Sequence, residues 1–359
     1  MMESKILLQR KLESAGITIL VGFCFGIIYP LFGDEITDKV AFINGISIGV
    51  LGALIISILE YFVFKIDARY GSFINLVIFK TLLYFVLFTL LILTTICFTR
   101  SIEKGVGFWD HFYGDEFQSF IFKGDFKIIL IYSLVILSII NFTRQINRKV
   151  GYGILLNFVL GKYHKPKEEE RIFAFIDLKN STEIAEKLGA LKFHKLLFEF
   201  FHDISLSILL TKGEIYRYVG DEIVVSWKIK DGLKEANCIR AYFFMKQQLK
   251  KQREKYLKLF GFVPDFHSAF HSGIVIRGEI GDIKSQLVFH GEAMFIASKI
   301  EKECSRSGND LLISSGLIQQ LSIPKTYEMI PAGCLPNYAN IKLYKLAETI
   351  NHQNDHESY

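Results

Sequence analysis

The chain has 359 residues, enough for two domains, and half of them are hydrophobic, with 14% aromatic and 22% charged residues. This composition is too apolar for an ordinary soluble protein. The formal net charge of +5 is modest and spread along the chain, so nucleic acid is not an expected partner.

The excess of apolar residues lies in four runs within the first 145 residues. Each run approaches the ~20 residues that cross ~30 Å of hydrocarbon as a helix. Buried helices of a soluble protein or a cleaved signal peptide are the alternatives, but four long runs in series favour membrane helices. We therefore predict an all-α four-helix transmembrane domain in residues 1–145, built on runs 15–33, 42–66, 75–98 and 126–142.

Positive charges flank these runs on alternate sides, and the intervening loops are richer in acidic residues. Arg10 and Lys11 precede the first run, Lys65 and Arg69 follow the second, and Arg144, Arg148 and Lys149 follow the fourth. Lys and Arg are enriched in cytoplasmic loops. Both termini are therefore predicted to be cytoplasmic, in a multi-pass protein of the cell inner (plasma) membrane.

A charged segment, residues 146–170, is predicted to link the membrane domain to a second domain at 171–346, which is followed by a polar tail at 347–359. The apolar middle of this linker, residues 154–160, suits an amphipathic helix that couples the two domains or pairs with a second subunit. An inert spacer is the equal alternative.

Strand and helix patterns alternate through the second domain. Asn180 with Glu183 resembles a capping box at the start of its first helix. The order β-α-β-β-α-β predicts an α+β domain with a ferredoxin-like core. The predicted elements are a strand at 172–178, a helix at 184–210, hairpin strands at 214–219 and 223–227, a helix at 233–259, strands at 266–281 and 287–289, and a helix at 293–302.

Two aspartates stand at strand ends, Asp177 after the first strand and Asp221 at the hairpin turn. A ferredoxin-like core makes these strands neighbours, so the two carboxylates would converge and suit one or two Mg²⁺ or Mn²⁺ ions. Backbone amides at Asn180, Ser181 and Thr182, where a helix begins, would suit a triphosphate. From spacing alone, an aspartate at a turn is more often a solvated turn former.

Three sequence blocks together resemble the class III adenylate/guanylate cyclase family. They occur in the same order along the chain, and at the same separations, as in that family. They are RIFAFIDLKNSTEIAEKLG at 171–189, EIYRYVGDEIVV at 214–225 and HSGIVIRGEIG at 271–281. The segment 161–170 resembles the entry to the domain in a bacterial, membrane-anchored branch of that family. The resemblance covers roughly residues 161–321, and the blocks are specific only as a set.

The resemblance implies a dimer in which one chain holds the metal ions and the other holds the base, the ribose and the developing charge. Asp177 and Asp221 match the metal pair, and Leu178 matches the position that lends a backbone carbonyl to one ion. The ribose 3′-oxygen would attack the α-phosphorus, and pyrophosphate would leave. The implied cofactor is Mg²⁺ or Mn²⁺, and the implied substrate is ATP in preference to GTP.

The half of the site that binds nucleotide departs from the family pattern at residues 291–299. Phe295 replaces an asparagine and cannot hydrogen-bond a ribose. Lys299 replaces a catalytic arginine and keeps the charge without the planar fork. Arg217 stands at the position where many adenylate cyclases recognise the base with a lysine. Val288 stands at the position of the Asp or Thr that usually accompanies this lysine.

Two functions follow from this pattern. The first is an active membrane-anchored cyclase that makes cAMP for signalling. The second is a pseudocyclase, which binds nucleotide as a regulator or donates the metal half-site to an intact chain in a heterodimer. A transporter or channel with a regulatory domain is a third possibility, but only Glu60 and Lys80 lie away from the ends of the apolar runs, with Glu60 interpreted as interfacial.

Histidines and cysteines give no separate metal signature. His267 and His271 share one face of a strand, but no third ligand has suitable spacing, so they are interpreted as packed or surface residues. The five cysteines form no CxxC pair and are interpreted as reduced thiols without a ligand role.

Overall fold

The structure is a computed structural model that describes residues 2–31, 39–62, 73–124, 126–150, 157–158, 160–323 and 327–348. The chain divides into two compact units, Met1–Leu156 and Asn157–Tyr359. Each unit is described by itself. All five cysteines are free.

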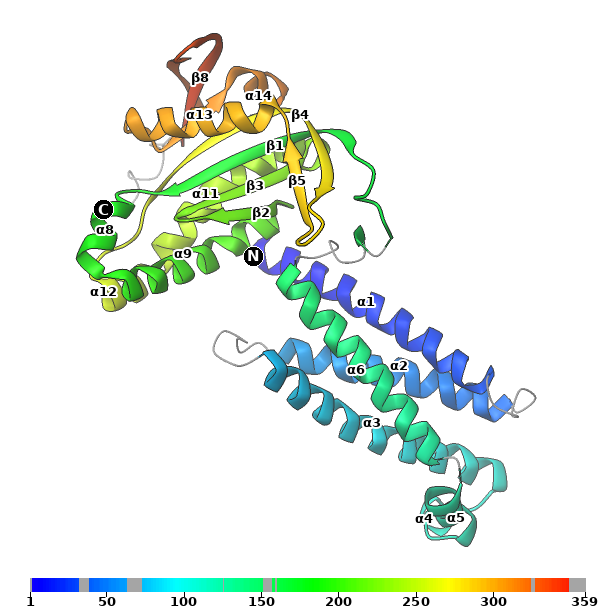
Figure 1. Cartoon of the computed structure of the whole chain (residues 1–359). Helices are drawn as coiled ribbons and strands as arrows, with labels where there is room; N and C mark the ends of the chain where they lie inside the picture. The colour runs from blue at the N-terminus through cyan, green and yellow to red at the C-terminus, as the bar shows by residue number, and fades with distance from the viewer. Residues whose placement is uncertain are drawn as a thin grey trace, which may run out of the picture. The chain divides into compact units, whose positions relative to one another are not determined.

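The N-terminal unit is entirely helical in its described residues (Figure 1). Three of its helices, α2, α3 and α6, are long and apolar enough to cross a membrane, whereas the apolar part of α1 covers only Ala15–Ile28. Among the described residues, the first predicted run, 15–33, is therefore not confirmed as a span, and neither is the predicted count of four spanning helices. The helices are α1 Met2–Leu31, α2 Lys39–Phe62, α3 Phe73–Lys104, α4 Phe108–Phe112, α5 Asp115–Lys123 and α6 Phe126–Val150.

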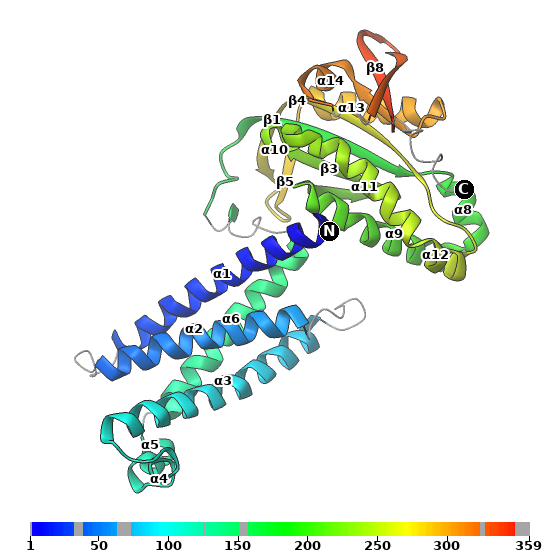
Figure 2. The ribbon, with the colours of Figure 1, turned by 180° about the vertical axis from the view of Figure 1, so that it is seen from behind.

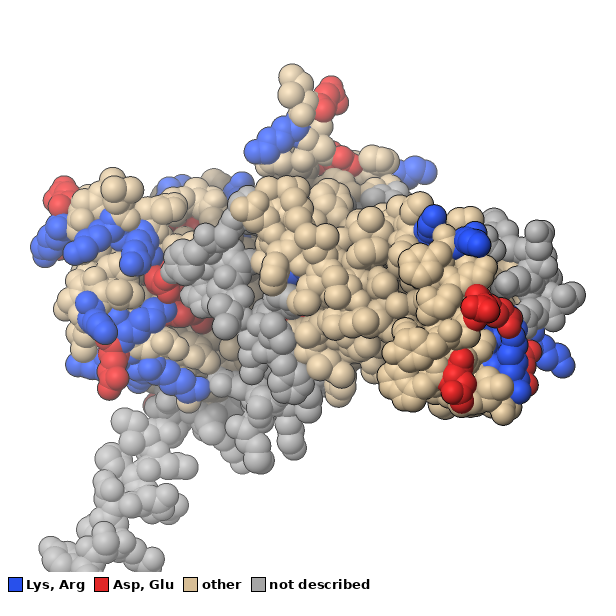
Figure 3. Space-filling model, turned by 90° about the horizontal axis from the view of Figure 1, so that it is seen from below, with Lys and Arg blue, Asp and Glu red and all other residues tan. Residues whose placement is uncertain are grey.

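The outer surface of the long helices is apolar. Large side chains such as Leu51, Phe79, Leu90 and Ile131 are exposed there. Figure 3 shows a broad surface of these helices that is largely free of Lys, Arg, Asp and Glu, with charged side chains gathered at its edge. An apolar exterior of this kind suits hydrocarbon better than water.

Helices α1 and α2 pack through glycines. A Cβ atom on Gly22 or Gly26 would meet the backbone of Gly49 or Gly45, and the converse holds for each partner. Small residues at four-residue spacing allow two helix backbones to approach closely in a membrane. This pair of helices therefore depends on the absence of side chains at four positions.

Polar side chains are paired inside the helical unit. The ammonium of Lys80 lies 2.7 Å from Glu60 Oε1, and the Tyr84 hydroxyl donates to the same oxygen at 2.8 Å. The Asn141 amide donates to the Val77 carbonyl at 2.9 Å. Glu60, which lies near the end of α2, therefore contributes to a contact between α2 and α3.

The C-terminal unit is built on one mixed sheet of eight strands. Its order, β2-β3-β1-β4-β6-β8-β7 with β5 paired to β4, begins with the four-strand ferredoxin-like arrangement that was predicted. The strands are β1 Lys167–Leu178, β2 Glu214–Val219, β3 Glu222–Lys228, β4 Phe266–Ile280, β5 Gln286–His290, β6 Leu311–Ser314, β7 Tyr327–Leu335 and β8 Tyr338–Glu348.

Helices cover both faces of this sheet. On one face, alternate residues of β1 such as Ile172 and Ile176 pack with α9 and α11, and α11 lies in front of the strands in Figure 2. On the other face, Phe173 and Phe175 pack with Ala297 of α13. Because strand side chains alternate between faces, Asp177 belongs to the α13 face. The helices are α8 Ser181–Leu188, α9 Ala190–Leu210, α10 Ile229–Leu233, α11 Asn237–Lys251, α12 Arg253–Phe260, α13 Glu292–Arg306 and α14 Ser315–Gln320.

Secondary structure extends into both ends of the predicted linker, 146–170. Helix α6 continues to Val150, and β1 already begins at Lys167, where it pairs with Arg277 of β4. The start of β1 is charged, which is typical of a linker. Its charges are paired within the sheet, as Glu169 is with Arg171 and Arg277. Most of the proposed coupling helix, 154–160, lies outside the described residues.

Two predicted helices are interrupted. The helix expected at 184–210 is α8 and α9, separated at Gly189, where φ is 73° and ψ is 159°. Asn180 has a left-handed backbone with φ 55° and makes no capping hydrogen bond through its side chain, so the predicted capping box is absent. The helix expected at 233–259 is likewise divided into shorter helices, with a 3₁₀ turn at Lys234–Ala236.

Candidate active site

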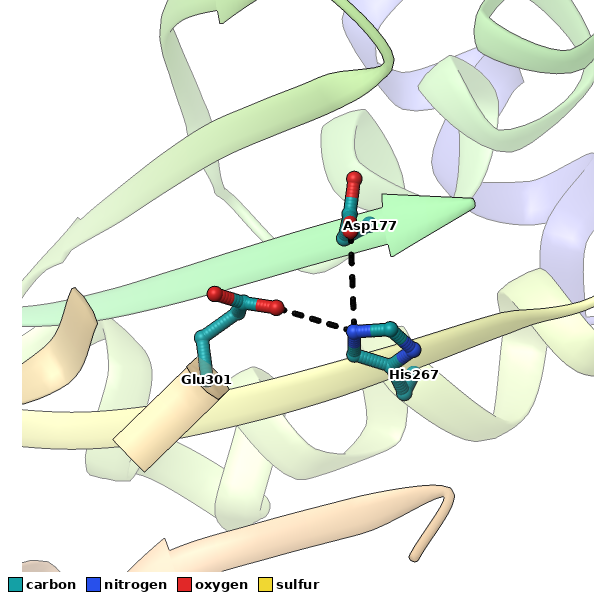
Figure 4. Close-up of side chains that lie close together, drawn as sticks. All are labelled: Asp177, His267 and Glu301. Carbon is teal, nitrogen blue, oxygen red and sulfur yellow. Dashed lines mark hydrogen bonds and ion pairs between the residues drawn. The ribbon is translucent and has the colours of Figure 1, made fainter. Parts of the chain in front are cut away.

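A row of polar side chains crosses three neighbouring strands on the α13 face. Asp177 of β1 pairs with Glu222 of β3 on one side and with His267 of β4 on the other. Glu301 reaches the same place from α13, and its Oε1 lies 2.9 Å from His267 Nε2. Asp177 Oδ2 lies 3.6 Å from the same nitrogen, so both carboxylates point toward one ring atom (Figure 4).

Asp221 joins this row from the turn between β2 and β3. Gly220 has φ 62°, which a tight turn requires and which glycine adopts without strain. The turn brings the Asp221 carboxyl within hydrogen-bonding reach of Asp177. Burial, then repulsion from Asp221 and Glu301, raises the pKa of Asp177 to about 7, while His267 opposes the rise.

Glu222 experiences the same environment. Burial and the charges of Glu301 and Asp177 raise the pKa of Glu222 to about 7, and Arg217 acts in the opposite direction. Four carboxyl groups thus share a small region on the α13 face. Such a cluster costs free energy unless it is protonated or neutralised by cations. Its oxygen ligands fit the hard cations Mg²⁺ and Mn²⁺.

The backbone beside the acids comes from the end of β1 and the start of α8. Leu178 is buried and ends β1 opposite Phe266. The Asn180 carbonyl accepts from the Ile184 amide at 3.0 Å, which closes the first turn of α8. The amides of Ser181 and Thr182 precede that bond, so helix geometry gives them no intrahelical acceptor.

A cavity of about 380 Å³ lies beside the acids, between β2, β3 and α13. Arg217 and Phe295 both line it, and Phe295 is half-exposed. Lys299 is one helical turn further along, and its ammonium lies 5.1 Å from the centre of the Phe295 ring. Glu222 also lines the cavity, so the cavity adjoins the acid cluster. The full lining is Phe175, Arg217, Val219, Glu222, Phe289, His290, Gly291, Met294, Phe295 and Ser298.

The structure therefore gathers the sequence-derived residues into two groups. Asp177 and Asp221 meet at the acid cluster, with Leu178 and the α8 N-terminus following directly in the chain. Arg217 and Phe295 meet at the cavity, with Lys299 against Phe295.

Three residues of the cluster were not identified from the sequence. Glu222 carried a signal, because it follows Asp221 in a strand that a hairpin places beside Asp177. His267 was dismissed because no third ligand had suitable sequence spacing, and Glu301 was not considered. His267 and Glu301 were missed because the side chains that they contact lie on other strands and helices, far away in the sequence.

His271 is a structural histidine, as expected. Burial lowers the pKa of His271 to about 4, so the ring is neutral near pH 7. Its Nδ1 lies 2.8 Å from the Ser314 hydroxyl of β6. This contact ties β4 to β6 and leaves His271 outside the acid cluster.

Comparison with known proteins finds relatives that are named as adenylate cyclases. The chain is 33% identical over 171 residues to "Adenylate cyclase 2" of Rhizobium meliloti (strain 1021), covering 48% of this chain and 47% of that protein. This similarity supports the class III adenylate/guanylate cyclase family that the three sequence blocks indicated. A second cyclase, "Adenylate cyclase" of Anabaena cylindrica, is 24% identical over 163 residues, covering 43% of this chain and 31% of that protein.

The chain thus spans about half of the first cyclase and about a third of the second. No protein-family model matches it. Among solved structures, a bacterial light-regulated adenylyl cyclase superposes with a TM-score of 0.53 at 18% identity, covering 64% of this chain and 68% of that chain. That superposition supports a cyclase-type fold alone.

Proposed function

We propose that this chain is a membrane-anchored nucleotidyl cyclase that converts ATP, in preference to GTP, to a cyclic nucleotide and pyrophosphate. The observation that carries the proposal is the convergence of Asp177 and Asp221, whose mutual repulsion helps raise the pKa of Asp177 to about 7. Two carboxylates held this close, with further acids around them, suit divalent cations. The preference for ATP rests on the names of the two cyclase relatives.

Asp177 and Asp221 would hold the Mg²⁺ or Mn²⁺ ions, with the Leu178 carbonyl as a further oxygen ligand. Such ions, when bound, would neutralise the charge that develops on the phosphate oxygens. The side chains of this site otherwise act by position, because cyclisation needs the ribose 3′-oxygen in line with the α-phosphorus. The amides of Ser181 and Thr182, beside Asn180 at the N-terminus of α8, would bind phosphate oxygens.

The nucleotide would be held by the second group of residues, from the partner chain of a dimer. Arg217 would contact the base from the wall of the cavity, and Phe295 offers a half-exposed ring in place of an amide. Lys299 would supply positive charge near the phosphates. As an ammonium, it can neutralise charge but cannot grip two oxygens with a planar fork.

The membrane anchor would consist of four helices, α1, α2, α3 and α6, in the cell inner (plasma) membrane, with both termini in the cytoplasm. The apolar exterior of α2, α3 and α6 supports this topology, as do the basic residues that flank the apolar runs. In this arrangement α1 spans with its apolar stretch and begins on the cytoplasmic side.

A catalytically impaired pseudocyclase is the second candidate, and the contact between Lys299 and Phe295 favours it. The ammonium lies over the Phe295 ring, a cation–π arrangement that gives the charge a partner within its own chain. Removal of one transition-state donor commonly costs ~10²–10³ in rate. A homodimer would then bind nucleotide with little turnover, and a heterodimer with an intact chain would be active.

Product formation by the full-length protein in detergent tests the proposal. We would supply ATP or GTP with Mn²⁺ and compare the wild type with Asp177→Asn. Cyclic nucleotide that is lost in the variant supports an active cyclase, and its identity decides the base. Metal-dependent nucleotide binding without product favours the pseudocyclase, and neither binding nor product contradicts both candidates.

A further inference from the structure

His267 and Glu301 are not accounted for by the proposed binding of nucleotide and hard cations. His267 is 5% exposed and Glu301 is 7% exposed, so both are buried polar groups on the α13 face. Burying a carboxylate and an imidazole side by side is costly unless each gains a strong partner. His267 and Glu301 partner each other through the 2.9 Å contact between Nε2 and Oε1, and Asp177 Oδ2 lies 3.6 Å from the same nitrogen.

The three side chains present ligand atoms to one point. His267 Nε2, Asp177 Oδ2 and Glu301 Oε1 lie within 4.8 Å of one another. The 3.6 Å separation of His267 Nε2 from Asp177 Oδ2 suits ligand atoms around one ion with bonds of about 2.0–2.2 Å. The 2.9 Å separation from Glu301 Oε1 is that of a hydrogen bond, which an ion would replace with a small outward shift of Glu301. The side chains come from β1, β4 and α13, so folded elements hold each of them.

The chemistry of this set differs from that of the aspartate pair. Mg²⁺ takes oxygen ligands and keeps much of its water, whereas an imidazole nitrogen favours first-row transition metals. One histidine with two carboxylates is a mixed nitrogen and oxygen set of the kind that binds Zn²⁺ with an open position for water. The nearby Asp221 and Glu222 add negative charge that attracts a dication.

We propose that Asp177, His267 and Glu301 form a Zn²⁺ site that shares Asp177 with the Asp177–Asp221 pair and takes its other two ligands from β4 and α13. Asp177 belongs to both sets and its side chain is one quarter exposed, which gives the ion a route from solvent. An ion on Oδ2 of Asp177 takes an oxygen from the hard-cation site. Zn²⁺ therefore competes with Mg²⁺ for Asp177, and inhibition of cyclisation by Zn²⁺ is the consequence, which rests on the proposed function.

Zn²⁺ titration of the full-length protein by calorimetry, with Mg²⁺ in excess, tests the site without relying on turnover. The wild type should bind one Zn²⁺ per chain at this site, and His267→Gln should weaken that binding at least as much as loss of a supporting contact does, roughly 10–100-fold. His194→Gln is the matched control, because His194 is exposed on α9. It should leave the affinity unchanged.

Two further measurements keep the result decisive. Glu301→Gln keeps the shape of the side chain and should also weaken Zn²⁺ binding, in case His267→Gln fails to fold. X-ray absorption at the zinc edge should show one histidine nitrogen at about 2.0–2.1 Å in the wild type. Wild-type protein that binds no Zn²⁺, or that binds it without a histidine nitrogen, would overturn the site.

The site and the proposed function can fail separately. Asp221→Asn removes one ligand of the hard-cation pair and should abolish cyclisation, but it leaves all three Zn²⁺ ligands in place. Zn²⁺ binding that persists in this variant supports the site whatever the turnover of the wild type. Zn²⁺ binding that is lost in Asp221→Asn and kept in His267→Gln assigns the ion to the aspartate pair and contradicts the inference.

Discussion

Asp177 and Glu222 are direct cross-strand partners on β1 and β3, so two carboxylates of like charge face each other in a half-buried pair. Like charges in this position destabilise a sheet. Such a pair is retained in a folded domain when a bound cation compensates for the repulsion. In the proposed function, the acid cluster would lower the stability of the cation-free protein and increase its affinity for a cation.

Glu222→Gln should therefore stabilise the cation-free protein at about pH 8, above the pKa of about 7 that Glu222 has in the cluster. The expected gain is about 0.2–1 kcal/mol, the size of a cross-strand pair contribution. Thermal unfolding in detergent with a chelator measures it, and Glu254→Gln on the exposed face of α12 is the control. A less stable Glu222→Gln variant under these conditions would show that the pair is not repulsive.

Affinity for Mn²⁺ should fall as pH falls through 7. The pKa of Asp177 is raised to about 7, so its carboxyl is protonated below that pH and must lose a proton to bind a cation. One displaced proton weakens binding by about tenfold per pH unit below the pKa. Calorimetry in buffers of different ionisation enthalpy measures the released protons. An affinity that stays flat between about pH 5 and 8 contradicts the raised pKa.

Replacement of Phe295 and Lys299 by the residues of the family pattern should raise turnover. Phe295→Asn restores a hydrogen-bonding side chain at the cavity, and Lys299→Arg restores a fork that can hold phosphate oxygens. The combined variant should gain on the order of 10²-fold or more, the size of one restored transition-state contact. The measured quantity is the initial rate of cyclic nucleotide formation. An unchanged rate would indicate that a partner chain supplies these functions.

The glycine contact between α1 and α2 should be intolerant of side chains. Gly49→Ala places a Cβ against the backbone of Gly22, whereas Gly16→Ala points into open space and serves as the control. The first change should cost about 1–3 kcal/mol, as overpacking does, and the second should be neutral or slightly stabilising. The midpoint of thermal unfolding in detergent distinguishes them. Equal effects at the two positions contradict the close helix packing.

Much of this fold follows from periodicity and turn chemistry. The hairpin and the long fourth strand were predicted close to their observed limits, because alternation and glycine-containing turns mark them. The first strand was predicted correctly at its end, Leu178, but it begins earlier, at Lys167. The division of one predicted helix at Gly189 was missed because the apolar spacing continues across it. Strands β6 to β8 were left undefined because β6 is short and the other two pair only with late segments.

The acid cluster could be predicted only in part. Convergence of Asp177 and Asp221 follows from strand order, because the hairpin must lie beside the first strand. The positions of His267 and Glu301 depend on the register of β4 and on the rotation of α13 over the sheet. Local sequence patterns determine neither the register of β4 nor the rotation of α13.

The central claim is that Asp177 and Asp221 act as one cation site in cyclisation. The most direct test compares the initial rates of cyclic nucleotide formation by the full-length wild type, Asp177→Asn, Asp221→Asn and the double variant with ATP and Mn²⁺. Residues that act as a unit are strongly non-additive. Each single variant should therefore lose nearly all activity, on the order of 10²-fold or more, and the double variant should be no worse than either. Single variants that keep most of the activity, or losses that multiply in the double variant, would contradict the account.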